Sequence, residues 1–165
     1  MGARNFREYS VWNEAVDYAT YVYEVTSKMP WLTMLTLVTT WANKQAWCLS
    51  LLQEFEKKGL CDQLQRAVVS ISSNIAEGAA RTSDAEFAHF LDIALGSAFE
   101  VETQLKIANN VGYFDNLDVD IRNDNLNDNL DNLDANLDID YQKLMDRIHS
   151  IERQLNALIS SIRKS

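Results

Sequence analysis

The sequence is poor in the residues that interrupt helices. It has one proline and five glycines in 165 residues. Sheet proteins with many turns use both residues often, so their scarcity favours a few long helices. The length suits one domain with its own core, and 47% of the residues are apolar. We therefore expect a single all-α domain over residues 1–165.

Cysteines are also scarce, and we find no signature of an enzyme. Cys48 and Cys61 are too few for a disulfide framework, and neither has a histidine at a recognisable helical spacing. A Gly-rich phosphate-binding loop is missing as well. The first eight residues have no apolar run that could serve as a secretion signal. We expect a cytoplasmic protein without catalytic residues, and with its thiols reduced.

Four stretches have apolar residues three and four positions apart, the spacing of amphipathic helices. They lie near 10–28, 60–79, 84–111 and 141–163. Pro30 should end the first helix, and Gly59 precedes the second. Together the four stretches predict an antiparallel four-helix bundle.

Local signals mark the ends of the second and third helices. Gly78 fits a stop at the end of the second. Ser83 and Glu86 form a capping box before the third, and Asn110 and Gly112 mark where it ends.

Residues 31–52 are strongly apolar. Their only charge is Lys44, and they hold three of the four tryptophans. A membrane span needs about 20 apolar residues, but Asn43 to Gln45 and four threonines interrupt this run. We favour an extra helix that packs on the bundle or on a neighbouring subunit, while the Thr-rich start also permits an extended or poorly ordered segment.

Residues 115–140 carry most of the negative charge. They contain nine aspartates and one basic residue, Arg122, whereas the whole chain has a net charge of −9. The low pI therefore does not exclude a basic patch elsewhere. Leucines keep a helical spacing here, so the fourth helix could extend back into the segment. A calcium loop would need a glycine and a closing glutamate, which are both missing.

Two helices carry residues that match a known family. The second has the run Ser73–Gly78, Ser-Asn-Ile-Ala-Glu-Gly, after Gly59-Leu60-Cys61 and Arg66-Ala67-Val68. The third has Phe87, Ala94-Leu95-Gly96-Ser97, Glu102-Thr103-Gln104-Leu105 and Gly112-Tyr113. With Phe6, Val11-Trp12 and Ala15, these residues closely resemble the four-helix-bundle proteins encoded in intervening sequences of bacterial 23S rRNA genes. That family is related to the accessory variability determinant (Avd) proteins of diversity-generating retroelements.

The resemblance implies a left-handed four-helix bundle that assembles as a ring-shaped homopentamer. For the retroelement branch it implies a reverse transcriptase and its template RNA as partners, and for the rRNA branch no established chemistry. The chain departs from the family pattern at Gln65-Arg66, where an Arg-Arg pair is usual, and at Ser72, where proline is usual. Residues 31–52 and 115–140 look like insertions into short family loops. The first departure and the acidic repeat weaken the case for nucleic-acid binding.

Two groups of polar residues are candidates for function. The candidates for contact with nucleic acid or a partner are basic: Arg4, Arg7, Lys57, Lys58, Arg66, Arg81, Lys106 and Arg147. The second group lines one side of the second and third helices: Ser70, Asn74, Glu77, Ser97, Glu100 and Gln104. This group could form a binding groove, but we favour a polar network that fixes helix register or joins subunits.

A metal centre of the ferritin type needs two Glu-x-x-His motifs and two further glutamates, all pointing into the bundle. The chain has Glu86 with His89 and Asp146 with His149, and Glu14 and Glu77 lie on the other two helices. Both histidines fall beside the apolar stripes of their helices, so we expect no metal site and no cofactor.

These observations predict a non-enzymatic, oligomeric accessory or scaffold protein that acts with RNA or a reverse transcriptase. Two alternatives stay open: a pure protein–protein interaction module, and a metal-binding bundle enzyme. We expect no membrane or small-molecule partner.

Overall fold

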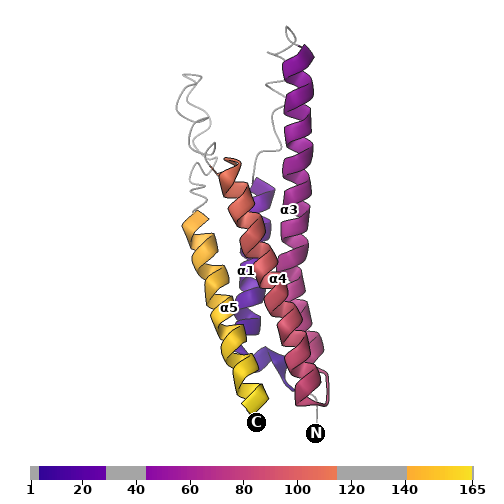
Figure 1. Cartoon of the computed structure of the whole chain (residues 1–165), viewed down its shortest axis with the longest axis vertical. Coiled ribbons are helices and arrows are strands. Elements are labelled where there is room, and N and C mark those ends of the chain that lie inside the picture. The colour runs from indigo at the N-terminus through magenta and orange to yellow at the C-terminus, as the bar shows by residue number, and fades with distance from the viewer. Residues whose placement is uncertain (1–3, 29–43, 115–140, 165) are drawn as a thin grey trace, which may run out of the picture.

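The computed structural model describes residues 4–28, 44–114 and 141–164. A short 3-10 turn, η1 (Phe6–Glu8), precedes four α-helices: α1 (Ser10–Lys28), α3 (Lys44–Ala79), α4 (Asp84–Asn110) and α5 (Tyr141–Lys164). Successive helices run in opposite directions, and both chain termini lie at one end (Figure 1). Within the described residues, which contain no strand, α1 packs against α3 and α5, and α4 packs against α3 and α5. The predicted all-α, antiparallel four-helix bundle is confirmed.

The apolar stripes of the four helices meet in one core. Ile71 and Ile75 from α3, Leu91 from α4 and Ile148 from α5 are completely buried. Tyr18 of α1 is also fully buried, and its hydroxyl donates a hydrogen bond to the Leu144 carbonyl oxygen at 3.1 Å. Burial raises the pKa of the Tyr18 phenol, so this hydroxyl stays protonated as a donor. The buried Tyr18 hydroxyl therefore has a hydrogen-bond partner, as nearly all buried polar groups do.

The prediction that the second helix starts after Gly59 is wrong. The helix α3 begins at Lys44, so Gly59 lies inside it, and in Figure 1 α3 extends past the ends of the other helices. Gly59 is exposed, and one glycine in a helix costs only about 1 kcal/mol. Good helix formers flank it in the run Glu54–Lys58, which explains why the helix continues. Residues 44–52 of the apolar segment are the first turns of α3, and residues 31–43 lie outside the described residues.

The predicted ends of α1, α4 and α5 agree with the structure within one residue. The Ser83 hydroxyl oxygen accepts the Glu86 N–H at 3.1 Å, as expected for the N-cap of α4. Gly112 adopts a positive φ of 77°, and its N–H donates to the Asn109 carbonyl oxygen, while the Tyr113 N–H donates to that of Ala108. This pair of bonds is a Schellman motif, which explains why α4 ends there.

The end of α3 near Gly78 is confirmed, but for another reason than the one expected. Gly78 lies inside the last turn of α3, where α4 comes very close. A Cβ at this position would lie 2.6 Å from Phe90 Cβ and 3.0 Å from Phe87 Cδ2. The glycine therefore allows α3 and α4 to pack closely at the end of the bundle where both termini lie, here called its base.

None of the described helices, which lie in residues 4–28, 44–114 and 141–164, is long and apolar enough to cross a bilayer.

Candidate functional site

Part of the predicted polar network joins α3 to α4 within one chain. The Ser70 and Ser97 hydroxyl oxygens lie 2.9 Å apart, and Ser97 also donates to the Ile93 carbonyl oxygen at 3.1 Å. The Asn74 amide donates to the Ser70 hydroxyl oxygen at 3.0 Å and to the Ser70 carbonyl oxygen at 2.7 Å. If Ser70 donates to Ser97, both hydroxyl protons have an acceptor. A satisfied network of this kind fixes the register of the two helices.

The other three members of the predicted network lie apart from these serines. Glu77 forms an exposed ion pair with Arg81 at 2.6 Å, one turn along the chain. The Gln104 amide donates to Glu100 at 2.9 Å. Gln104 is buried, and its Oε1 atom has no hydrogen-bond partner among the described residues.

Arg4 and Arg81 hold the base of the bundle together. The Arg4 guanidinium donates to the Arg81 carbonyl oxygen at 2.8 Å, ion-pairs with Asp84, and lies 4.9 Å from the centroid of the Phe87 ring. The Arg81 guanidinium lies 4.7 Å from the centroid of the Phe90 ring. These contacts fasten the N-terminal segment to the turn between α3 and α4, so both arginines already have partners.

The remaining basic candidates fall into two groups. The Arg7 guanidinium lies over the Phe6 ring at 4.6 Å, and that of Arg147 lies 5.3 Å from the ring centroids of both Tyr18 and Tyr21. A second group consists of exposed residues that form no ion pair within the described part of the chain: Lys58, Arg66 and Lys106. The side chain of Lys57 lies outside the described residues.

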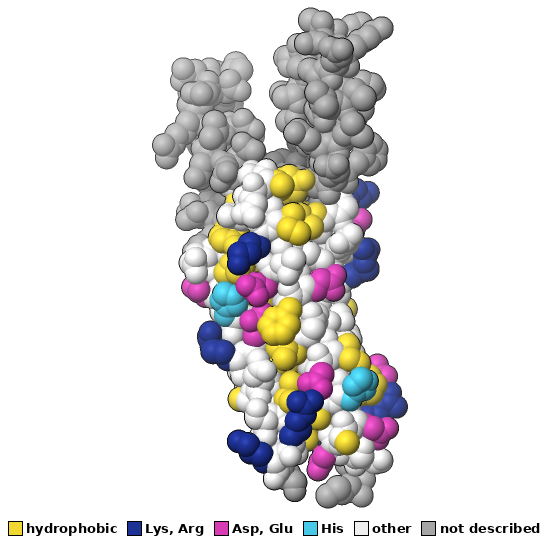
Figure 2. All heavy atoms as spheres, viewed as in Figure 1, with side chains coloured by type: hydrophobic (Ala, Val, Ile, Leu, Met, Phe, Trp, Pro, Cys, Tyr) yellow, Lys and Arg dark blue, Asp and Glu magenta, His cyan; other side chains and the backbone are white. Residues whose placement is uncertain are grey.

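Large apolar side chains are exposed along α4. Ile93, Phe99 and Ile107 of α4 and its C-cap residue Val111 are 40–56% exposed, and Val69 on α3 is 41% exposed. Figure 2 shows hydrophobic side chains on the face that contains α4. Apolar residues gathered on one face mark a surface suited to another protein.

The six residues considered for a ferritin-type metal centre are not brought together. The Glu86 carboxylate accepts a hydrogen bond from the Ser83 hydroxyl at 2.8 Å, and His89 is exposed with its ring 6.0 Å from that of Phe90. Glu14 accepts a hydrogen bond from Gln154, and Asp146 accepts one from Gln142 at 2.9 Å. Glu77 is paired with Arg81, as described above.

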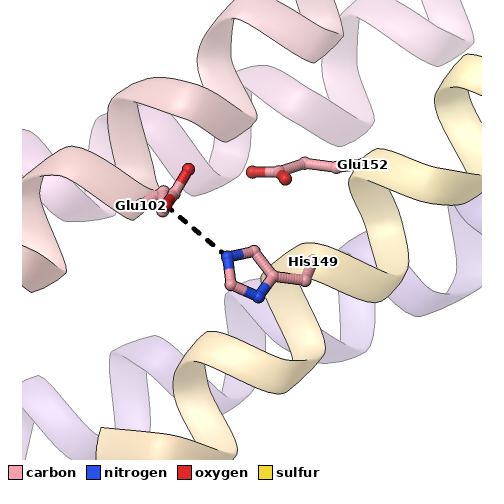
Figure 3. A group of neighbouring side chains, drawn as sticks. All are labelled: Glu102, His149 and Glu152. Carbon is pink, nitrogen blue, oxygen red and sulfur yellow. Dashed lines mark ion pairs between the residues drawn. The ribbon is translucent and has the colours of Figure 1, made fainter.

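His149 instead lies close to Glu102 and Glu152, which were not among the metal ligands considered from the sequence. Figure 3 shows Glu102 on α4 facing His149 and Glu152 on α5. One possible ligand atom from each residue lies within 4.8 Å of the other two, and His149 Nε2 is 3.6 Å from Glu102 Oε1. Burial, followed by the Glu102 charge, raises the pKa of Glu152, against the opposing effects of His149 and Arg153. The His-x-x-Glu spacing is visible in the sequence, but Glu102 joins it only through the register of α4 and α5.

The chain matches the model of a known protein family. The model of the 23S rRNA-intervening sequence proteins matches residues 42–135, which is more than half of the chain. The chain belongs to this family. The match contains all of α3 and all of α4, whereas α1 and α5 lie outside it. A comparison with curated proteins gave no match.

Membership of the 23S rRNA-intervening sequence proteins confirms the resemblance carried by α3 and α4. The family is not a known enzyme family, and together with the helical bundle it fits a non-enzymatic accessory protein. The match begins within residues 31–52 and ends within residues 115–140. That both segments are insertions stays a prediction.

Proposed function

We propose that this protein is an oligomeric, non-enzymatic accessory protein that binds RNA. The observation that carries the proposal is that three of the basic candidates on α3 and α4 are exposed and form neither an ion pair nor a ring contact in the described chain: Lys58, Arg66 and Lys106. Cations of this kind can bind phosphate without first breaking an internal contact. The other described basic candidates lie against aromatic rings or carboxylates of the bundle.

The register of α3 and α4 places these three residues in one half of the bundle. The Ser70–Ser97 contact sets the two antiparallel helices level with each other. At 1.5 Å per residue, Arg66 lies about 6 Å beyond that level, Lys106 about 14 Å and Lys58 about 18 Å, all in the same direction. These three residues, here called the basic group, lie within roughly 12 Å along the bundle axis, and their positive charges attract an RNA backbone to this half of the bundle.

Assembly would repeat the basic group in every subunit. The exposed apolar residues of α4 offer a surface for a second copy, and the homopentamer implied by the resemblance would repeat the three charges around a ring. An assembly with many weak phosphate contacts binds RNA more tightly than a single chain does. After the first contact has formed, the later contacts are intramolecular.

The salt dependence of RNA binding tests this proposal. We would measure the affinity for a fluorescein-labelled, mixed-sequence single-stranded RNA by anisotropy at several salt concentrations. Arg66→Gln with Lys106→Gln should lower the affinity and flatten the plot of log affinity against log salt by about 0.7 per lost phosphate contact. Arg153→Gln with Lys164→Gln removes the same charge from α5 and is the matched control. Equal effects of the two double variants, or no binding by the parent protein, would overturn the proposal.

The exposed apolar residues of α4 also favour a second candidate, a protein-interaction module. In the retroelement branch the expected protein partner is a reverse transcriptase. This candidate predicts that Phe99→Ser weakens partner capture with little dependence on salt, whereas RNA binding is strongly salt-dependent.

A further inference from the structure

The cluster of Glu102, His149 and Glu152 lies between α4 and α5, and Glu102 is one helical turn before Lys106 of the basic group. Glu102 projects from α4, and His149 and Glu152 project from successive turns of α5 (Figure 3). Residues three positions apart in a helix lie on one face, so the spacing of His149 and Glu152 directs both toward Glu102.

The hydrogen bonds of the described chain leave this cluster incomplete. The Oε1 atom of Glu152 is buried and has no hydrogen-bond partner among the described residues. Figure 3 shows the Glu152 carboxylate directed toward the Glu102 carboxylate. Two carboxylates held so close repel each other unless a proton or a cation lies between them. The pKa of Glu152 is raised first by burial and then by this repulsion.

The distances suit a metal ion better than a direct contact. A tetrahedral zinc ion holds ligand atoms about 2.0–2.2 Å away, so its ligands lie roughly 3.3–3.6 Å from one another. His149 Nε2 and Glu102 Oε1 are 3.6 Å apart, and all three ligand atoms lie within 4.8 Å. A small rotation of the flexible Glu152 side chain would complete the set.

We propose that Glu102, His149 and Glu152 form a binding site for a divalent transition metal of the zinc type, which joins α4 to α5. One imidazole and two carboxylates are a ligand set that zinc accepts, and the fourth position is left for water. The side chains of Glu102 and His149 are 29% and 39% exposed, so an ion can enter from solvent. The site stabilises the contact between the two helices and is independent of the proposed RNA binding.

Zinc titration of the untagged full chain tests the site. We would compete zinc against a chromophoric chelator in millimolar magnesium, because magnesium occupies sites made of carboxylates alone, such as the aspartates of residues 115–140. The expected result is one saturable zinc site per chain. Since changes to groups that only support a ligand cost about 10–100-fold in affinity, Glu102→Gln, His149→Gln and Glu152→Gln should each cost at least about 100-fold.

Two controls separate this site from other ligands. His89→Gln removes the other histidine, which is exposed on α4, and should leave zinc affinity unchanged. Cobalt in place of zinc should give an absorption spectrum without a thiolate charge-transfer band, which excludes Cys48 and Cys61 as ligands. Circular dichroism of each variant establishes that the bundle has folded.

Thermal unfolding supplies a second readout. Zinc should raise the unfolding temperature of the parent chain, because it binds only the folded site. Glu152→Gln should remove this increase. The proposal is overturned if no saturable binding occurs in magnesium, if His149→Gln binds zinc as the parent does, or if cobalt shows thiolate ligation.

Discussion

The rings of Phe114 and Tyr141 lie 5.5 Å apart, centroid to centroid, although residues 115–140 separate them in the chain. Phe114 follows the end of α4 and Tyr141 begins α5. The two ends of this long connection therefore meet at one end of the bundle. A much shorter connection could span the same gap.

We accordingly predict that residues 115–140 are dispensable for the bundle. Replacing them with a short Gly-Ser linker should leave the helix content of the described helices and the assembly mass unchanged, because closure entropy changes only slowly with loop length. The change also removes about eight negative charges per chain, so RNA should bind more tightly. Changing the nine aspartates to asparagine at constant length is the control for charge alone. Unfolding or dissociation of the shortened chain would show that the leucines of this segment belong to the core.

A second prediction concerns the close approach of α3 and α4. Gly78→Ala should destabilise the protein by about 1–3 kcal/mol, because the new Cβ would collide with Phe90 Cβ and the helices would have to separate. Gly59→Ala is the matched control in the same helix, since nothing lies within 4 Å of that position. It should stabilise the protein by about 0.5–1 kcal/mol. Chemical denaturation measures both effects, and a neutral Gly78→Ala would contradict the packing described here.

A third prediction follows from the raised pKa of Glu152. The folded chain holds the Glu152 proton more tightly than the unfolded chain does. The stability contributed by this proton is thus complete below the unfolded pKa, about 4.3, and is lost as pH rises through the folded value. In the presence of a chelator, Glu152→Gln should match the parent protein near about pH 4 and exceed its unfolding temperature near about pH 7.

The control for that pH series is Glu24→Gln, which removes one exposed carboxylate from α1. The prediction is contradicted if the difference in unfolding temperature between Glu152→Gln and the parent protein becomes smaller as pH rises. A carboxyl group whose pKa is raised requires this difference to grow.

The helices could be predicted from the sequence because their signals are local. Apolar spacing, the Ser83 cap and the Gly112 stop each act within one or two turns, and they placed α1, α4 and α5 within one residue. Gly59 misled the prediction because a glycine lowers helix propensity without ending a helix whose neighbours are strong helix formers. At Gly78 the predicted helix end was right, but the reason was not visible in the sequence, since the role of this glycine depends on the close approach of α4.

The candidate sites depended on contacts between helices, which the sequence shows poorly. The sequence indicated that Ser70 and Ser97 lie on the polar sides of their helices, but their contact with each other depends on the register of α3 and α4. That Arg4 is held at the base of the bundle could not be seen, because its partners Arg81 and Asp84 lie far from it in the chain. Glu102 was missed as a partner of His149 for the same reason.

The most direct test of the account is the mass of the assembly with and without RNA. Size-exclusion chromatography with light scattering, refractive index and ultraviolet detection gives the protein mass and the bound RNA in one run. We predict five chains of 18.8 kDa, about 94 kDa of protein, that elute together with a mixed-sequence single-stranded RNA at low salt and release it at high salt. A protein mass of 18.8 kDa that elutes apart from the RNA at every salt concentration would contradict the account.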